Sequence, residues 1–146
     1  MMEIFIRRIS KEDAVAIAAL SYQLGYPLSL EQTLQNINAV MENKDHNAFV
    51  ATHANKVIGW VGVAQTIQLE TLAFCEIRGL VVDEQYRKKG VGKMLIEKAK
   101  QWGKEKGNNK LRLRCNLKRT ETHQFYQHLG FQETKQQKVF ELRLDY

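Results

Sequence analysis

The chain has 146 residues, of which 44% are hydrophobic and 26% are charged, a balance that indicates one ordinary globular domain over residues 1–146. No apolar run is long enough to cross a bilayer, and the N-terminus lacks the basic-then-apolar order of a signal peptide, so we expect a cytoplasmic protein without a membrane partner. The net charge of +6 is uneven, because residues 83–119 carry 13 basic and 4 acidic side chains. That basic segment favours a polyanionic partner, either a polyphosphate or a nucleic acid.

The hydrophobic periodicity predicts an α/β (α+β) chain in the order β-α-α-β-β-β-α-β-α-β-β. Helices are expected at about 14–24, 30–41, 90–106 and 120–129, and strands at about 4–9, 49–52, 57–66, 71–82, 110–115, 131–133 and 139–144. Ser10 and Ser29 carry N-capping signals, and Gly107 follows the third helix as a terminating glycine. Cys75 and Cys115 fall in apolar strand patterns without metal-ligand spacing, so we expect two buried thiols and no metal site.

The stretch from Glu76 to Leu95 contains an apolar strand, a short polar loop and an amphipathic helix. Its loop reads R-K-K-G-V-G over residues 87–92. A helix N-terminus presents unpaired N–H groups and the positive end of the helix dipole, which makes it an anion site. Glycines at 90 and 92 remove the Cβ atoms that would hold an anion away from those amides, and the adjacent cations add charge. The stretch therefore predicts a polyphosphate cradle, the alternative being an ordinary strand-to-helix turn with solvated lysines.

Two other phosphate loops do not match this stretch. A Walker A loop needs glycine at position 87 and Ser or Thr after Lys93, but the chain has Arg87 and Met94. The dinucleotide fingerprint needs a third glycine where the chain has Leu95.

The remaining pattern, R-x-x-G-x-G after a strand ending in L-V-V, resembles the pyrophosphate loop of the GNAT superfamily of acetyl-CoA-dependent N-acyltransferases. The segment F-Y-Q-H-L-G-F at 125–131 resembles a second GNAT signature, and R-T-E-T-H-Q-F-Y at 119–126 resembles an aminoglycoside-acetyltransferase-like subgroup. The resemblance covers almost the whole chain. It implies the GNAT fold, with a mixed, mostly antiparallel sheet of about seven strands and four helices on both faces.

The resemblance implies acetyl-CoA as co-substrate and no metal. The diphosphate would bind the loop and the first turn of the helix, and the pantetheine arm would lie along the end of the preceding strand, with Gly79 as the bulge residue. Many family members have asparagine where this chain has Arg119, so Asn116 and Arg119 are alternative contacts. The implied cofactor-binding residues are Leu80, Val81, Val82, Arg87, Lys88, Lys89, Gly90, Val91, Gly92, Lys93, Asn116, Arg119 and Phe125.

The resemblance also places two catalytic residues. Glu76 occupies the position of the general base in several GNAT enzymes, and its alternative is a solvated glutamate on a sheet face or edge. An alkylammonium group with a pKa of ~10.4 costs about 4–5 kcal/mol to deprotonate at pH 7, which is why a base is needed. Tyr126 occupies the position of the general acid that protonates the departing thiolate, and its alternative is packing beside Phe125 and Leu129.

The expected activity is transfer of an acetyl group to a primary amine of a small molecule or a protein, by direct attack on the thioester. The candidate substrate residues, chosen by position in the fold, are Tyr22, Tyr26, Trp60 and Glu70. Two alternatives remain: a GNAT-fold module that binds acyl-CoA without turnover, and a basic nucleic-acid-binding domain. The second lacks aromatic residues interleaved with its basic ones, so we expect no nucleic-acid partner. A homodimer is a further expectation from the family.

Overall fold

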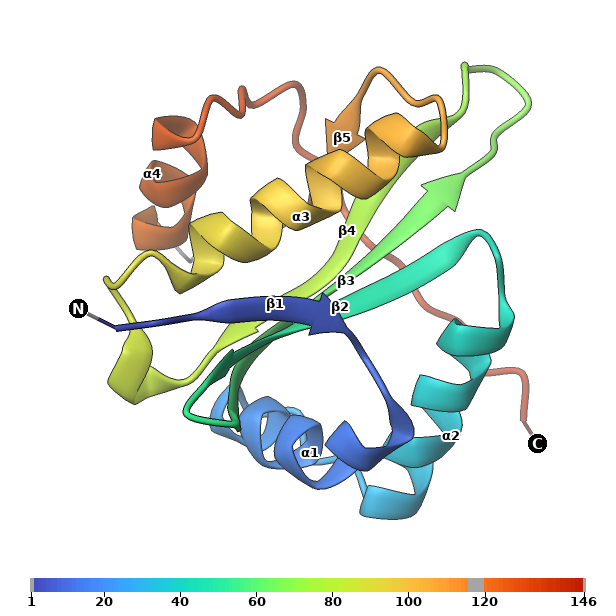
Figure 1. The fold of residues 1–146 in the computed structure, drawn as a ribbon. Helices are drawn as coiled ribbons and strands as arrows, with labels where there is room; N and C mark the ends of the chain where they lie inside the picture. Colours follow the sequence, from blue (N-terminus) through green and yellow to red (C-terminus); the bar gives the residue numbers. More distant parts are fainter. Residues whose placement is uncertain (1, 116–119, 146) are drawn as a thin grey trace. The chain divides into compact units, whose positions relative to one another are not determined.

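The structure is a computed structural model that describes residues 2–115 and 120–145. It divides into two compact units, residues 1–114 and residues 115–146. The first unit contains the sheet and the helices α1, α2 and α3, and the second contains α4 (Thr120–His128) (Figure 1).

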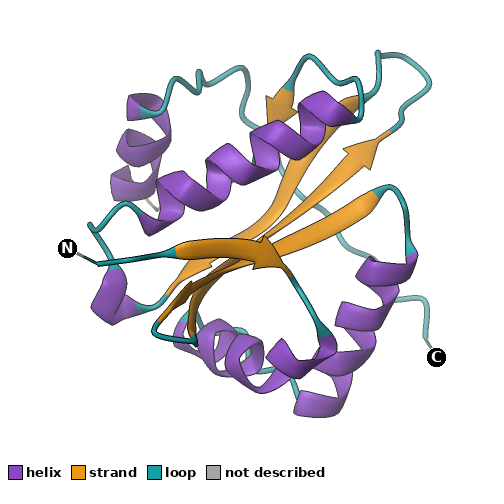
Figure 2. Ribbon diagram, in the orientation of Figure 1, coloured by secondary structure: helices purple, strands orange, loops and turns teal. Residues whose placement is uncertain are grey.

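A five-stranded sheet in the order β1-β2-β3-β4-β5 organises the first unit (Figure 2). Neighbouring strands run antiparallel from β1 to β4, whereas β5 runs parallel to β4. The parallel pair needs a crossover connection, which α3 provides. The strands are β1 (Phe5–Arg8), β2 (His46–His53), β3 (Lys56–Thr66), β4 (Phe74–Val82) and β5 (Leu111–Arg112).

Helices cover both faces of this sheet (Figure 1). On one face, α1 (Ala14–Gln23) and α2 (Leu30–Glu42) bury Ile17, Leu20 and Ile37 against Val50 and Val81 of the strands. The opposite face carries α3 (Val91–Glu105), whose buried residues recur at helical spacing. The predicted mixed, mostly antiparallel sheet with helices on both faces is confirmed, as is the element order as far as α4.

The ends of the helices follow the predicted capping signals. The Ser29 hydroxyl accepts a hydrogen bond from the Gln32 N–H at 3.0 Å. Asp13 lies in the short 3₁₀ helix η1 (Lys11–Asp13), where its carboxylate accepts the Ser10 N–H at 2.8 Å and both guanidinium N–H groups of Arg7 at 2.8 and 2.9 Å. Burial raises the pKa of Asp13, but these hydrogen bonds and the Arg7 charge outweigh it, so the pKa lies below its usual value.

Three sequence predictions are corrected by the structure. Within the described part of residues 131–145 there is no strand, so the sheet has five strands rather than about seven. The pattern over 139–144 favours a strand, but a strand also needs a neighbour to take its backbone hydrogen bonds, and Phe140 and Leu142 are exposed here. The fifth strand is limited to two residues, and Cys115, expected to be buried, is exposed while Cys75 is buried.

In the part of the chain that the structure describes, none of the helices combines the length and the apolar character that a bilayer crossing requires.

Candidate active site

The centre of the site is a β-bulge in β4. Gly62 of β3 pairs with Gly79, and the next β3 residue, Val63, pairs with Ile77, which leaves Arg78 as the extra residue. A Cβ atom added to Gly79 would lie 2.7 Å from the Trp60 ring, so the position next to the bulge accepts only glycine without a shift of the indole. The prediction of a bulge at Gly79 is thus correct to within one residue. Leu80, Val81 and Val82 follow the bulge as the last part of β4.

The loop after β4 leads directly into the N-terminus of α3. Asp83 caps the short 3₁₀ helix η2 (Glu84–Tyr86), and the chain then takes left-handed conformations at Lys88 (φ 62°) and Gly90 (φ 84°). Gly90 is the N-cap residue of α3, and no side chain in the described ranges 2–115 and 120–145 caps the helix there. The first-turn amides of α3 are therefore available to a ligand.

The surroundings of these amides fit a polyanion. A Cβ added to Gly90 would meet no atom of the described residues within 4 Å, so they leave the space in front of the helix end open. The cations of the loop and first turn, Arg87, Lys88, Lys89 and Lys93, are all exposed. Val91 is 1% exposed, so this predicted contact could act only through its backbone. The residues present thus fit the diphosphate of coenzyme A in charge, access and donors.

Glu76 lies on β4 just before the bulge and is 3% exposed, which rules out the solvated glutamate considered from the sequence. Its carboxylate faces three guanidinium groups: Arg112 at 3.1 Å, Arg78 at 3.2 Å and Arg114 at 3.5 Å. Glu76 and Arg112 are paired residues of the parallel strands β4 and β5, which brings their side chains to one face of the sheet. Sequence reasoning missed these three arginines. The alternation L-R-L-R at 111–114 was the signal for Arg112 and Arg114, and Arg78 had none.

Cys75, the neighbour of Glu76, points to the other face of β4. A Cβ added to Gly103 of α3 would lie 3.1 Å from the Cys75 sulfur, so helix and strand are in close contact there. Burial, together with the nearby charge of Glu76, raises the pKa of the Cys75 thiol to about 11. This thiol is therefore protonated at neutral pH and belongs to the core.

The predicted substrate residues are only partly brought to the site. The Trp60 ring lies against β4 at Gly79. Tyr22 at the end of α1 and Tyr26 after it are 71% and 62% exposed, and Glu70 lies exposed in the connection between β3 and β4.

The second unit carries the other predicted residues. Tyr126 lies on α4 between two aromatic neighbours, with ring centroids 5.4 Å from Phe125 and 5.8 Å from Phe131. Phe125 is 36% exposed. Asn116 and Arg119 lie outside the described residues.

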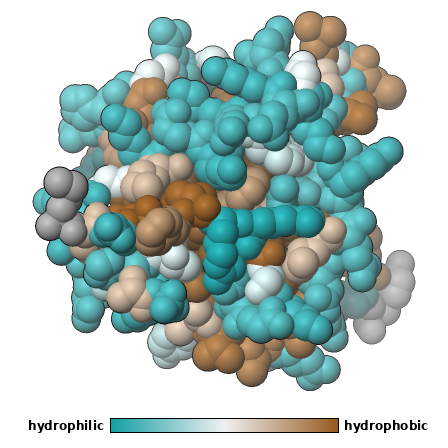
Figure 3. All heavy atoms as spheres, viewed as in Figure 1, coloured by the Kyte–Doolittle hydropathy of each residue, from teal (hydrophilic) through white to brown (hydrophobic). Residues whose placement is uncertain are grey.

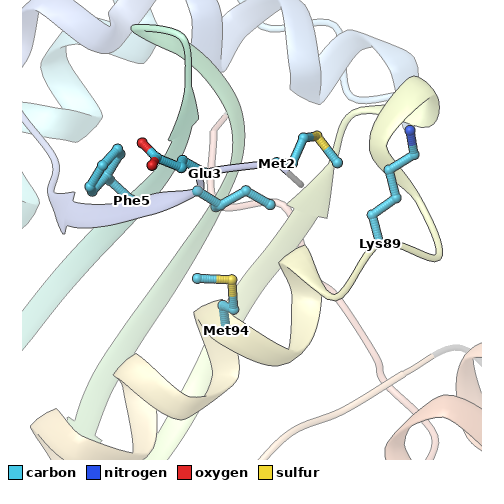
Figure 4. Close-up of a pocket in the computed structure, with 6 residues that line it drawn as sticks. Met2, Glu3, Phe5, Lys89 and Met94 are labelled. Carbon is cyan, nitrogen blue, oxygen red and sulfur yellow. The ribbon is translucent and has the colours of Figure 1, made fainter.

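A hollow that the sequence did not indicate lies between the N-terminal segment and α3. Its volume is about 620 Å³, and its lining residues are Met2, Glu3, Ile4, Phe5, Lys89 and Met94. Figure 4 shows Met94 projecting from α3 towards the N-terminal segment, with Lys89 at one end of the hollow. Phe5 is 62% exposed and Met94 37% exposed, and hydrophobic surface is visible beside the N-terminal strand in Figure 3. The hollow shares Lys89 with the loop but carries no clustered acid or base.

The chain matches the family model "Acetyltransferase (GNAT) family" over residues 12–131, which is most of its length. The chain belongs to the GNAT acetyltransferase family. It is accordingly an enzyme of the acyltransferase class.

Relatives of this GNAT protein are N-acetyltransferases by name. It is 29% identical over 133 residues to an uncharacterized N-acetyltransferase of Chlorobaculum tepidum, an alignment that covers 90% of this chain and 77% of that protein. It is 26% identical over 117 residues to an uncharacterized N-acetyltransferase of Bacillus subtilis, covering 80% and 82% of the two chains.

Solved structures share the GNAT fold of this chain. An aminoglycoside N-acetyltransferase in complex with CoA superposes with a TM-score of 0.88 at 21% identity, over 98% of this chain and 97% of the other. An aminoglycoside 6′-N-acetyltransferase from Acinetobacter haemolyticus superposes with a TM-score of 0.84 at 23% identity, over 97% and 99% of the chains.

Proposed function

We propose that this GNAT protein transfers an acetyl group from acetyl-CoA to a primary amine. The observation that carries the proposal is the N-terminus of α3, which has no side-chain cap among the described residues, is open at Gly90 and follows a run of three cations. This is the anion site that the diphosphate of coenzyme A requires. One structurally similar protein was solved in complex with CoA, which supports this cofactor. Both similar structures described above are named as aminoglycoside acetyltransferases, and these names support a small-molecule amine as acceptor.

In the proposed reaction the neutral amine nitrogen attacks the thioester carbonyl carbon. A carbon–nitrogen bond forms, the carbon–sulfur bond breaks, and the thiolate of coenzyme A leaves. Glu76, directly or through a water molecule, receives the proton that the ammonium group gives up. Tyr126 donates a proton to the departing sulfur, and the second proton that the nitrogen loses on becoming an amide passes, directly or through water, to the Tyr126 oxygen and restores the neutral phenol. The backbone of Leu80–Val82 lies after the bulge, where the pantetheine arm would run.

The arginines around Glu76 favour a second candidate role for this residue. A proton taken up by Glu76 would leave three guanidinium groups without their counter-ion, whereas an ionised Glu76 holds them in position. Glu76 would then be a positioning residue, and a water or the substrate itself would carry the proton away.

Steady-state rates separate these roles. If Glu76 is the base, Glu76→Gln slows acetylation of a strongly basic alkylamine more than Tyr126→Phe does, and raising the pH restores much of the loss because the amine then deprotonates in solution. A loss in Glu76→Gln that is independent of pH and appears mainly in KM assigns the positioning role. A larger loss in Tyr126→Phe than in Glu76→Gln at neutral pH contradicts the assignment of the base.

The acetyltransferase proposal itself is tested by two measurements. Calorimetry should detect CoA binding to the wild type and much weaker binding to Gly92→Glu, which places a carboxylate at the α3 N-terminus. Release of the free thiol from acetyl-CoA in a broad panel of amines should show turnover. CoA binding without turnover for any amine would identify a non-catalytic acyl-CoA-binding module instead.

A further inference from the structure

The substrate class of this enzyme follows from the arginines that surround Glu76. We propose that the acceptor amine carries an anionic group, a carboxylate or a phosphate, and that Arg78 and Arg114 bind this group. The inference rests on the proposed function, because it names the acceptor of that same reaction.

The arginine cluster around Glu76 carries an excess of positive charge. One carboxylate faces Arg78, Arg112 and Arg114 within 3.5 Å, so the cluster has three positive charges and one negative charge, a net charge of +2. Lys110 adds a further cation beside it, with its amino group 5.0 Å from the centre of the Phe74 ring. A buried carboxylate needs a counter-ion, but one well-placed guanidinium group already provides it.

Two of the three arginines are exposed, and one is not. Arg112 is the arginine that fits the structural role, because its side chain is 20% exposed, donates to Glu76 at 3.1 Å and stacks over Phe74 at 4.2 Å. Arg78 and Arg114 instead have side chains 53% and 59% exposed. Ion pairs with such exposed partners contribute little to stability, so stability alone does not account for two more arginines at this carboxylate.

The geometry of the arginine side chains suits an anionic ligand. A guanidinium group carries five N–H donors in a planar fork that matches carboxylate and phosphate oxygens. In the contacts to Glu76, Arg78 uses Nη1 and Arg114 uses Nε. Arg78 places a second nitrogen, Nη2, 3.4 Å from the Thr66 hydroxyl, a weak contact that an anion can replace.

Arg78 lies near the Trp60 ring on the sheet. Arg78 is the bulge residue of β4, and a Cβ added to Gly62 would lie 3.7 Å from the Trp60 ring and 4.0 Å from the Arg78 Cβ, so the indole and Arg78 flank the same glycine. Within the described residues the buried Trp60 Nε1 has no hydrogen-bond partner. This part of the sheet therefore combines an aromatic wall, an unsatisfied donor and two accessible cations next to the proposed catalytic carboxylate.

The experiment compares amines that differ only in an anionic group: γ-aminobutyrate against n-butylamine, and phosphoethanolamine against ethanolamine. Initial rates of CoA thiol release give kcat/KM for the wild type, Arg78→Gln, Arg114→Gln and the control Lys100→Gln. Lys100 lies on α3, over the opposite face of the sheet, and its substitution removes the same unit of charge. The two pairs distinguish a carboxylate site from a phosphate site.

For the wild type we expect kcat/KM to be about tenfold or more higher for the anionic member of at least one pair. A ratio of this size is what one charge-assisted hydrogen bond contributes. Arg78→Gln and Arg114→Gln should each reduce that preference, mainly through KM, while Lys100→Gln leaves it unchanged. Arg78→Lys and Arg114→Lys keep the positive charge and should retain part of the preference for the anionic amine. Melting temperatures identify any variant that is not folded. If a Gln variant is unfolded, the corresponding Lys variant decides whether that arginine contributes to the preference.

Three results overturn the inference: a wild-type preference of one or below for both pairs, a preference that neither arginine variant alters, or an equal loss in Lys100→Gln. Turnover of the neutral amines alone would refute the anionic acceptor and leave the acetyltransferase function intact. If no amine is acetylated, the proposed function fails, and calorimetry of γ-aminobutyrate and butylamine with the CoA-loaded protein decides the inference by itself. Binding of the anionic probe alone supports it, and equal binding or no binding overturns it.

Discussion

The two ends of α3 allow the cofactor cradle to be tested with a matched pair of substitutions. Gly90 precedes the helix at φ 84° and Gly107 follows it at φ 87°, and at either position an added Cβ meets no atom within 4 Å in the part of the chain that the structure describes. Gly90→Ala and Gly107→Ala therefore carry the same backbone cost and no steric cost. Only Gly90 adjoins the amides proposed to bind coenzyme A.

The magnitude follows from the left-handed backbone. An L-residue there costs about 1–2 kcal/mol, part of which is offset by the lower entropy of alanine in the unfolded chain, leaving about 1 kcal/mol. For a chain of this size that corresponds to a melting temperature lower by about 3 °C in both variants. In Gly90→Ala the methyl group also enters the space that a phosphate would occupy and shifts the amides. Loss of one charge-assisted hydrogen bond weakens binding by about 1.5–3 kcal/mol, which is at least tenfold in Kd.

The assay is calorimetric titration of CoA into each variant, with thermal unfolding measured on the same samples. We expect Gly107→Ala to bind CoA like the wild type and Gly90→Ala to bind at least about tenfold more weakly, at similar melting temperatures. Equal CoA affinity of the two variants, or a greater loss in Gly107→Ala, would refute the assignment of the α3 N-terminus.

The remaining predictions concern stability and reactivity. The lowered pKa of Asp13 means that its contribution to stability is complete above the unfolded value of about 3.9 and is lost as pH falls through the folded pKa. Asp13→Asn should therefore cost about 1–2 kcal/mol at pH 7, since its arginine partner is half-exposed, and the difference from the wild type should shrink towards pH 2 in urea unfolding curves. Native Cys75 should resist iodoacetamide at pH 8 and react after unfolding, as followed by peptide mass mapping; rapid native labelling would contradict its burial. Gly59→Ala places a Cβ 2.9 Å from the Val81 carbonyl oxygen and should destabilise by about 1–3 kcal/mol, whereas Gly62→Ala, with its nearest atom at 3.7 Å, should cost less. Equal unfolding free energies for these two variants would show that β3 and β4 can separate at Gly59.

Local patterns predicted the elements that carry their own signals. The apolar spacing of α3, the terminating Gly107 and the N-cap at Ser29 are each defined within a few residues, and the structure confirms all three. The two strands expected after α4 were wrong because a strand exists only with a partner, and an alternating pattern does not provide one.

Similarly, an apolar neighbourhood in sequence predicted burial of both cysteines. Burial depends on what packs over the residue, and this differs between Cys75, which lies under Gly103 of α3, and Cys115, which follows the end of β5 in the chain and is exposed.

The sequence by itself determined the family, the order of elements as far as α4 and the position of the glycine-rich loop, because each of these is written in short stretches of neighbouring residues. The tertiary structure alone decided the surroundings of Glu76. Residues 76 and 112 become neighbours only through the parallel pairing of β4 and β5, and that register turns Arg112 towards the buried carboxylate, with Arg114 following two residues after the strand ends. The electrostatic interactions of a site depend on distances between segments far apart in the chain, and these distances are set only in the folded protein.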